Sequence, residues 1–193
     1  MTLIRPIILY PVYILGFLSI VVLGRRSFDV AFESISCTTN VKYANISTTS
    51  CYVDDSQKPP KGYVSIEMSK VVTNLNMSID LIALKSNTEH FKVFSEKNVD
   101  GCMFMENKIE TTMLKIVYEI TTTGGKYPKC PITKDNHIDL KGITIDAEKF
   151  PPYLPEAKYS MSLKTYIGPE ILFRIDVITK VIQKKNHKQR IFY

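Results

Sequence analysis

The chain has 193 residues, with 25 lysines and arginines, 19 aspartates and glutamates, four cysteines, eight glycines, ten prolines and no tryptophan. This composition is typical of a globular domain and excludes collagen, a coiled coil and low-complexity disorder. The formal net charge is +6, but most basic residues are interspersed with carboxylates, which gives little support to a polyanionic partner.

The first 24 residues are predicted to be a secretory signal peptide. Residues 6–23 form an apolar run without a charge, with Arg5 before it and Arg25 soon after it. Val22 and Gly24 are small enough for the cleavage site that signal peptidase requires. The run is also close to the shortest length that spans ~30 Å of hydrocarbon, so an uncleaved anchor is the alternative. Cleavage after Gly24 is the preferred interpretation, and it predicts a secreted, extracellular protein.

Cysteine content agrees with an oxidising compartment. An even number of cysteines follows the leader, which predicts a disulfide framework: Cys37, Cys51, Cys102 and Cys130. Four cysteines allow three connectivities, and the sequence does not choose among them. The smaller loop-closure entropy of near neighbours favours Cys37 with Cys51 and Cys102 with Cys130. No C-x-x-C spacing occurs and the three histidines are distant in sequence, so no metal site is predicted.

Two glycosylation sequons lie in the mature chain, at Asn45-Ile46-Ser47 and Asn76-Met77-Ser78. They predict N-linked glycans at Asn45 and Asn76, and glycosylation requires both side chains to face solvent.

Alternation of apolar and polar residues predicts extended strands in the first half of the mature chain. The predicted elements, in order, are strands at residues 28–37 and 41–53, a turn at 54–62, strands at 64–68 and 77–83, and a short strand at 91–94 before a loop at 96–101. The strands at 64–68 and 77–83 are expected to be antiparallel neighbours.

One segment follows a helical period. Between residues 106 and 121 the apolar side chains are spaced by three or four, which predicts a helix with a single apolar stripe that ends before Gly124-Gly125. The stripe consists of Ile109, Met113, Ile116, Val117 and Ile120. Its β-branched residues lower the helix propensity of the segment.

Alternation returns in the last third of the chain. It predicts extended structure at 138–145, then a proline-rich loop at 150–155 and two long strands joined by a turn at Gly168-Pro169. The expected inward residues are Tyr159, Met161, Leu163, Thr165 and Ile167 on the first strand, and Ile171, Phe173, Ile175, Val177 and Val181 on the second.

These elements predict a mainly β fold. About eight short strands and one short helix describe an antiparallel two-sheet β-sandwich or cup that disulfides staple together. The predicted organisation is a signal peptide at 1–24, one sandwich domain at 25–182 and a basic tail at 183–193.

No motif of a known catalytic site occurs in the chain. The nucleophile elbow, the P-loop, the dinucleotide-binding glycine motif and the zinc-protease motif are all absent. His90 and His137 stand in polar surroundings and are interpreted as solvated surface residues. We therefore expect a protein that is not an enzyme and that needs no cofactor.

The basic tail favours no nucleic-acid partner, because stacking aromatics are not interleaved with its charges. Each basic residue near an anionic membrane adds ~1 kcal/mol of attraction, so membrane contact is expected to be transient at most.

The inner faces of a cup either fill the space between the sheets or leave a cavity for a ligand. Alternation alone favours a filled core. The expected inward side chains are nevertheless rich in thioethers and aromatic rings, which adapt to apolar ligands. The candidate cavity residues are Met68, Met77, Phe91, Phe94, Phe104, Tyr159, Met161, Leu163, Phe173 and Ile175. The mouth of such a cavity is expected near Tyr153, Lys158 and Tyr159.

The cysteine framework and its flanking residues resemble a known family. The chain is similar to the insect secreted proteins that include the CheB chemosensory proteins. The similarity is carried by a first strand that ends at Cys37, the step Cys51-Tyr52-Val53, the segment at 99–104 (VDGCMF) and the segment at 129–132 (KCPI). That family is similar in turn to the ML lipid-recognition proteins, which are β-cups with an apolar cavity. The resemblance implies a secreted protein that binds a lipid-like ligand.

Two functional hypotheses follow. The first is a secreted carrier of a small apolar or amphipathic ligand, such as a lipid or hydrocarbon pheromone, that modulates a chemosensory response. The alternative is an extracellular accessory module of a sensory channel or receptor, with a solid core and no bound ligand.

Overall fold

The computed structural model describes residues 26–85 and 89–184. The predicted signal peptide lies outside the described residues, as does the basic tail beyond Lys184. The elements in chain order are β1 (Phe28–Thr39), the 3-10 helix η1 (Ile46–Thr48), β2 (Ser50–Asp54), β3 (Lys61–Ile66), β4 (Asn76–Leu84), β5 (His90–Asp100), α2 (Gly101–Met105), α3 (Thr112–Thr121), η2 (Thr122–Gly124), β6 (Ile138–Ile143), η3 (Ala147–Lys149), β7 (Lys158–Ile167) and β8 (Glu170–Gln183).

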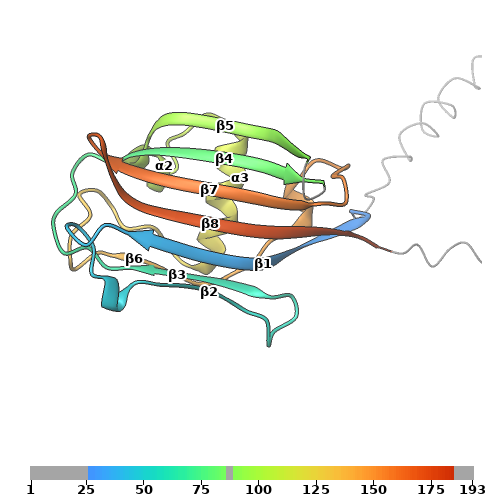
Figure 1. Ribbon diagram of the computed structural model, residues 1–193, viewed down its shortest axis with the longest axis horizontal. Coiled ribbons are helices and arrows are strands. Elements are labelled where there is room, and N and C mark those ends of the chain that lie inside the picture. Colours follow the sequence, from blue (N-terminus) through green and yellow to red (C-terminus); the bar gives the residue numbers. More distant parts are fainter. Residues whose placement is uncertain (1–25, 86–88, 185–193) are drawn as a thin grey trace, which may run out of the picture.

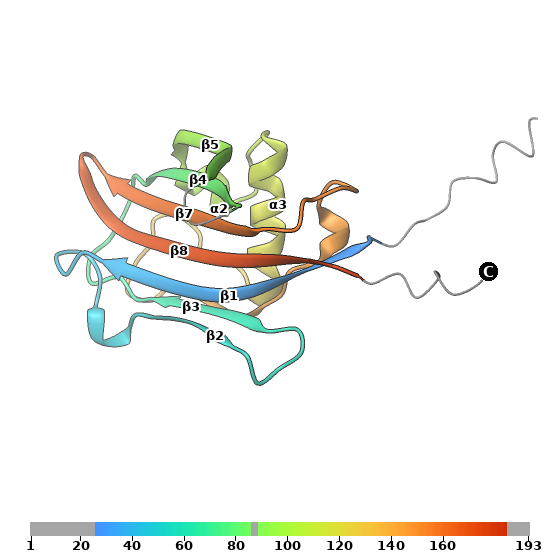
Figure 2. The same ribbon diagram turned by 45° about the vertical axis from the view of Figure 1, so that its right-hand side comes forward.

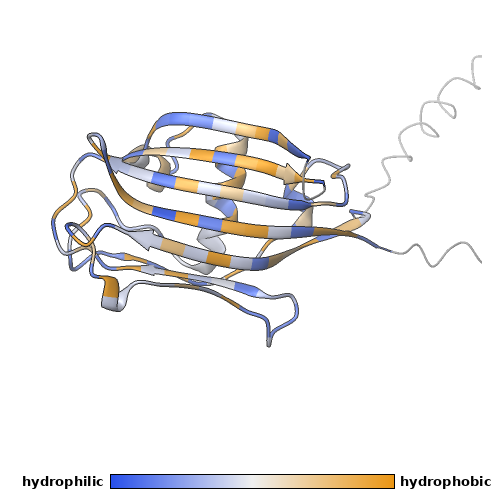
Figure 3. Cartoon of the chain, in the orientation of Figure 1, coloured by the Kyte–Doolittle hydropathy of each residue, from blue (hydrophilic) through white to orange (hydrophobic). Residues whose placement is uncertain are grey.

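The strands form two antiparallel sheets (Figure 1). The larger sheet has the order β1-β8-β7-β4-β5 and the smaller sheet has the order β2-β3-β6. The smaller sheet lies next to β1, and α3 crosses behind the larger sheet at an angle to its strands (Figures 1 and 2). Apolar and polar residues alternate along the larger sheet, as Figure 3 shows. The prediction of a mainly β, two-sheet fold is confirmed.

Both disulfides have the favoured connectivity. Cys37 of β1 is bonded to Cys51 of β2, with their Cα atoms 5.7 Å apart, so this bond joins the two sheets. Cys102 of α2 is bonded to Cys130, with a Cα–Cα distance of 5.8 Å, and ties α2 to the segment that leads into β6. Pairing of near neighbours in sequence is thus confirmed.

A short helix that the periodicity did not predict begins directly after β5. The Asp100 carboxylate caps α2 by accepting backbone hydrogen bonds from its first turn. The helix ends at Met105, and Asn107, the residue after the C-cap Glu106, has a φ of 58°. There the Asn107 N–H donates to the Phe104 carbonyl at 3.0 Å and the Lys108 N–H donates to the Met103 carbonyl at 2.8 Å. This Schellman arrangement stops α2 and turns the chain.

The predicted helix at 106–121 is therefore wrong in its first turns. The observed helix α3 starts at Thr112, because the segment before it is used to terminate α2. Ile109 of the predicted stripe is buried but lies outside the helix.

The pairing predicted for the strands at 64–68 and 77–83 is also wrong. β3 pairs with β2 and β6, whereas β4 pairs with β5 and β7 in the other sheet. Alternation reports which side of a strand is buried, and a strand buried on one side fits either sheet of a sandwich. Residues 67–75 carry the chain from one sheet to the other.

Extended structure at 41–53 is correct only for β2. The Asn40 carbonyl accepts hydrogen bonds from the Tyr43 and Ala44 N–H groups at 3.0 Å each, which forms a turn instead of a strand. Asn45 then caps η1 by accepting a hydrogen bond from the Ser47 N–H.

Two further local predictions are wrong. The loop expected at 96–101 is mostly strand, since β5 continues to Asp100. β5 lies at the edge of its sheet, where polar side chains meet solvent and alternation is lost. Ile171 was expected to face inward but is 46% exposed, and Leu172 is fully buried in its place. A register shift between Thr165 and Tyr166 next to the β7–β8 turn changes the facing of these residues.

Candidate ligand-binding cavity

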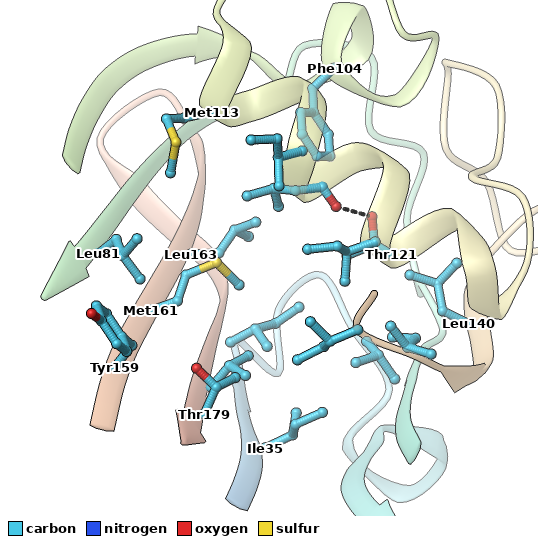
Figure 4. A pocket seen from close by; sticks show the side chains of 18 of the residues that line it. Ile35, Leu81, Phe104, Met113, Thr121, Leu140, Tyr159, Met161, Leu163 and Thr179 are labelled. Atoms are coloured by element: carbon cyan, nitrogen blue, oxygen red, sulfur yellow. Dashed lines mark hydrogen bonds between the residues drawn. The ribbon is translucent and has the colours of Figure 1, made fainter. Parts of the chain in front are cut away.

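A cavity of about 240 Å³ lies between the larger sheet, the smaller sheet and α3 (Figure 4). Its walls come from the inner faces of β1, β4, β7 and β8, from β3 and β6, and from one face of α3. The proline-rich loop at 150–155 contributes Phe150, Pro151 and Leu154 to the wall at one end. Elements from both ends of the described chain therefore enclose one space.

The buried apolar side chains form two clusters. The larger cluster contains Phe104, Leu172 and Phe173, and a smaller one contains Phe28 and Val181. Residues of both clusters line the cavity. Met161, Leu163 and Ile175 alternate correctly on the inner face of the larger sheet but are only half-buried, because they face the cavity. The core of this sandwich is hollow.

No charged side chain lines the cavity within the described residues. The polar groups are a few hydroxyls, and most are hydrogen-bonded to the protein. Thr121 donates to the Val117 carbonyl at 2.9 Å, which is the bond drawn in Figure 4. Thr165 donates to the Phe173 carbonyl at 3.0 Å. Such a lining favours apolar ligands, since the energy of transfer from water scales with the apolar area that is buried.

Tyr127 belongs to the cavity wall. Its ring makes edge contacts with Phe104 at a centroid distance of 5.6 Å and stacks on Tyr118 at 5.9 Å. Burial raises the pKa of Tyr127 to about 12, although its hydroxyl also interacts with Thr121. Tyr127 is half-buried and lines the cavity. The Tyr127 hydroxyl is therefore a neutral group at physiological pH.

The raised pKa of Tyr127 predicts a gradual loss of stability as the pH rises above 10. An unfolded tyrosine ionises near 10, so the neutral form of Tyr127 stabilises the fold fully below that pH, and this contribution of about 3 kcal/mol is lost as the pH rises to about 12. In a spectrophotometric titration, we expect one tyrosine to ionise near 12. The Tyr127→Phe variant should lack the ionisation near pH 12. If the variant still shows this ionisation, it belongs to another tyrosine.

The cavity opens to solvent at one end of the sandwich. Val93 of β5 lines the cavity and is 50% exposed. Pro151 in the proline-rich loop also lines the cavity and is exposed. Tyr153 in this loop is 79% exposed. Tyr159 lines the cavity and donates a hydrogen bond to the Pro155 carbonyl at 3.1 Å. Of the three residues expected at the mouth, Tyr159 lines the cavity and Tyr153 does not. Lys158 also lies outside the lining, and it is exposed and ion-paired with Glu33.

The structure brings most of the predicted cavity residues together. Those that line the cavity are Met77, Phe104, Tyr159, Met161, Leu163, Phe173 and Ile175.

Three candidates do not line it. Met68 is fully buried and borders a separate surface hollow near Asn45, and Phe91 is 54% exposed at the sheet edge. A bulge in β5 pairs Phe94 and Lys92 with consecutive residues of β4, which leaves Val93 on the cavity wall and packs Phe94 against the core.

Sequence reasoning missed one wall of the cavity. The cavity is lined by four residues of the predicted helical stripe, Met113, Ile116, Val117 and Ile120, none of which is among the candidate cavity residues. The spacing of these residues identifies the face of α3 that lies against the cavity, whereas Leu114, the fully buried residue of this helix, lies outside the predicted stripe. Thr179 also lines the cavity. The sequence does not predict this role, because threonine is common in alternating strands.

Both sequon asparagines are exposed. Asn45 precedes η1, and Asn76 begins β4, opposite Tyr166 near the β7–β8 turn. The mouth lies at the other end of β4, where that strand approaches the proline-rich loop (Figure 1). Glycans at these positions would leave the mouth open.

Other kinds of site receive no support from the described part of the chain. His90 and His137 are exposed and lie outside the cavity lining. Among the residues that the structure describes, no group of three or more histidine, cysteine or acidic side chains is placed to hold a metal ion. Within the same residues, no helix is both long enough and apolar enough to cross a membrane.

The fold and the cavity together define a disulfide-linked β-sandwich with an apolar interior. A family model described as a protein of unknown function (DUF1091) matches residues 74–161. The matched span runs from just before β4 into β7 and contains α2, α3 and the Cys102–Cys130 disulfide. No curated protein matches the chain.

Proposed function

We propose that this chain is a secreted, non-catalytic binding protein that carries a small apolar or amphipathic ligand in its internal cavity. The observation that carries the proposal is a space of about 240 Å³, free of charged side chains and open at one end. A side-chain-filled core would have needed no such space, because interiors normally close-pack. The resemblance to CheB proteins supports a role in chemosensory or pheromone response, with a lipid or hydrocarbon as the ligand.

The cavity volume suits a single short chain. An apolar cavity of about 150 Å³ holds benzene, so 240 Å³ accommodates about ten carbon atoms. Burial of each methylene contributes about 0.8 kcal/mol, or about 8 kcal/mol for ten, before the loss of ligand freedom on association is subtracted. A longer chain would project through the mouth beside Val93 and Pro151.

The alternative function is an accessory module of a sensory channel or receptor. That hypothesis expects a solid core and function through exposed surfaces. The cavity favours the carrier over this alternative, since an empty apolar space lowers stability without serving a surface-binding module.

Native mass spectrometry of the protein secreted from insect cells tests the proposal. We expect a mass larger than that of the polypeptide and its glycans, and we expect organic extraction to remove this excess. The melting temperature should fall by about 5 °C or more after extraction. A ligand that binds only the native state stabilises it by mass action, which explains the expected fall. Extraction of a heat-stable control protein under the same conditions would show that the solvent itself does no damage.

A polypeptide-plus-glycan mass with a melting temperature unchanged by extraction or by added lipid would contradict the carrier hypothesis. It would favour the accessory module, and a search for protein partners would follow. The same spectra report the N-terminus, because cleavage after Gly24 and a retained leader give different masses.

A further inference from the structure

The hydroxyl of Thr179, on the cavity wall, has no hydrogen-bond partner among the residues that the structure describes. Thr179 lies on the inner face of β8, between Val177 and Val181, and all three residues line the cavity. It is opposite Tyr159 of β7 and Phe32 of β1, so it occupies the sheet wall near the mouth (Figure 4). No hydrogen bond joins its side chain to another described residue.

Three other hydroxyls that line the cavity are engaged. Thr165 bonds the Phe173 backbone, Tyr159 donates to the Pro155 carbonyl, and Thr121 donates to carbonyls within its own helix. Tyr127 belongs to the helix side, where its ring packs against Phe104 and Tyr118. On the sheet wall opposite α3, Thr179 is the lining residue whose hydroxyl has no hydrogen bond to another described residue.

The surroundings of Thr179 restrict the chemistry of what it binds. No cation lines the cavity within the described residues, and an ionised carboxylate buried without a partner is strongly disfavoured. The desolvation of a neutral oxygen costs far less free energy than that of a carboxylate. A threonine hydroxyl can both donate and accept a hydrogen bond. One hydroxyl among apolar side chains matches one oxygen on an apolar chain.

We propose that the cavity selects a neutral chain that carries a single oxygen function, such as an alcohol, ketone or ester, and that Thr179 is the specificity-determining residue that hydrogen-bonds this oxygen. This inference rests on the proposed carrier function and adds the chemical class of the ligand.

Competition with the fluorescent apolar probe N-phenyl-1-naphthylamine tests the inference on the mature, glycosylated protein. The competitors are decane, 1-decanol, 2-decanone and decanoate at neutral pH, each measured on the wild type, Thr179→Val and Thr179→Ser. Valine has the shape of threonine without the hydroxyl, and serine keeps the hydroxyl. Comparing each ligand across variants removes the differences in ligand hydration.

We expect Thr179→Val to weaken binding of 1-decanol and 2-decanone by about three- to tenfold, the range of one hydrogen bond, with decane unaffected. Thr179→Ser should retain the preference for the oxygenated chains, and decanoate should bind the wild type at least tenfold more weakly than 1-decanol. An equal change for decane and 1-decanol in Thr179→Val would overturn the inference. Failure of every competitor and of the probe to bind the wild type would instead overturn the carrier function itself.

Discussion

Replacement of Met161 by glutamate is expected to lower the affinity for an apolar ligand by at least tenfold while the protein remains folded. Met161 lies on the inner face of β7, is half-buried and lines the cavity (Figure 4). Because no charged side chain lines the cavity in the described chain, a carboxylate there would bring water with it and lose that water when a ligand enters. The readout is the dissociation constant for 1-decanol and decane by probe displacement.

A matched control lies on the same strand. Ser160 is the neighbour of Met161 and points to the opposite face of β7, so Ser160→Glu adds the same charge outside the cavity and should leave binding unchanged. Burial would raise the pKa of the introduced carboxyl at position 161, so binding should recover in acid, when that carboxyl is neutral. A folded Met161→Glu protein that binds decane with wild-type affinity at neutral pH would mean that ligands bind elsewhere.

The sequence predicts some of the cavity residues and not others. The period-two pattern of β7 placed Tyr159, Met161 and Leu163 on one buried face, and they do line the cavity. The pattern could not tell a filled core from a hollow one, because both need apolar inner faces. The difference resides in distances between sheets and α3, which no local pattern encodes.

The errors also have local physical causes. Asn107 adopts a left-handed conformation that ends α2, and this one residue divides the segment that a smooth helical period had joined. Extra residues at bulges in β5 and at the β7–β8 turn shifted Phe94 and Ile171 away from their expected faces. Cysteine pairing was predictable because both bonds join near neighbours, whereas the assignment of β3 and β4 to different sheets was not.

Removal of the Cys102–Cys130 disulfide is expected to lower the free energy of unfolding by about 3–4 kcal/mol and to weaken ligand binding as well. The bond closes a loop with a sequence separation of 28, and the loss follows from the chain entropy that the unfolded protein regains. It also holds α2 in place, and Phe104 of this helix packs edge-on against Tyr118 at a centroid distance of 5.8 Å. Denaturant unfolding and probe displacement on Cys102→Ala/Cys130→Ala measure the two effects.

The other disulfide separates stability from binding. Cys37 and Cys51 enclose a shorter separation of 14 and neither residue lines the cavity, so Cys37→Ala/Cys51→Ala should lose about 3 kcal/mol of stability with ligand affinity little changed. Equal losses of affinity in the two double variants, at matched fractions of folded protein, would indicate that binding follows global stability. A loss confined to Cys102→Ala/Cys130→Ala would instead show that α2 and the aromatic side chains packed on it hold the helix side of the cavity in a binding-competent form, because Phe104 and Tyr127 belong to that wall.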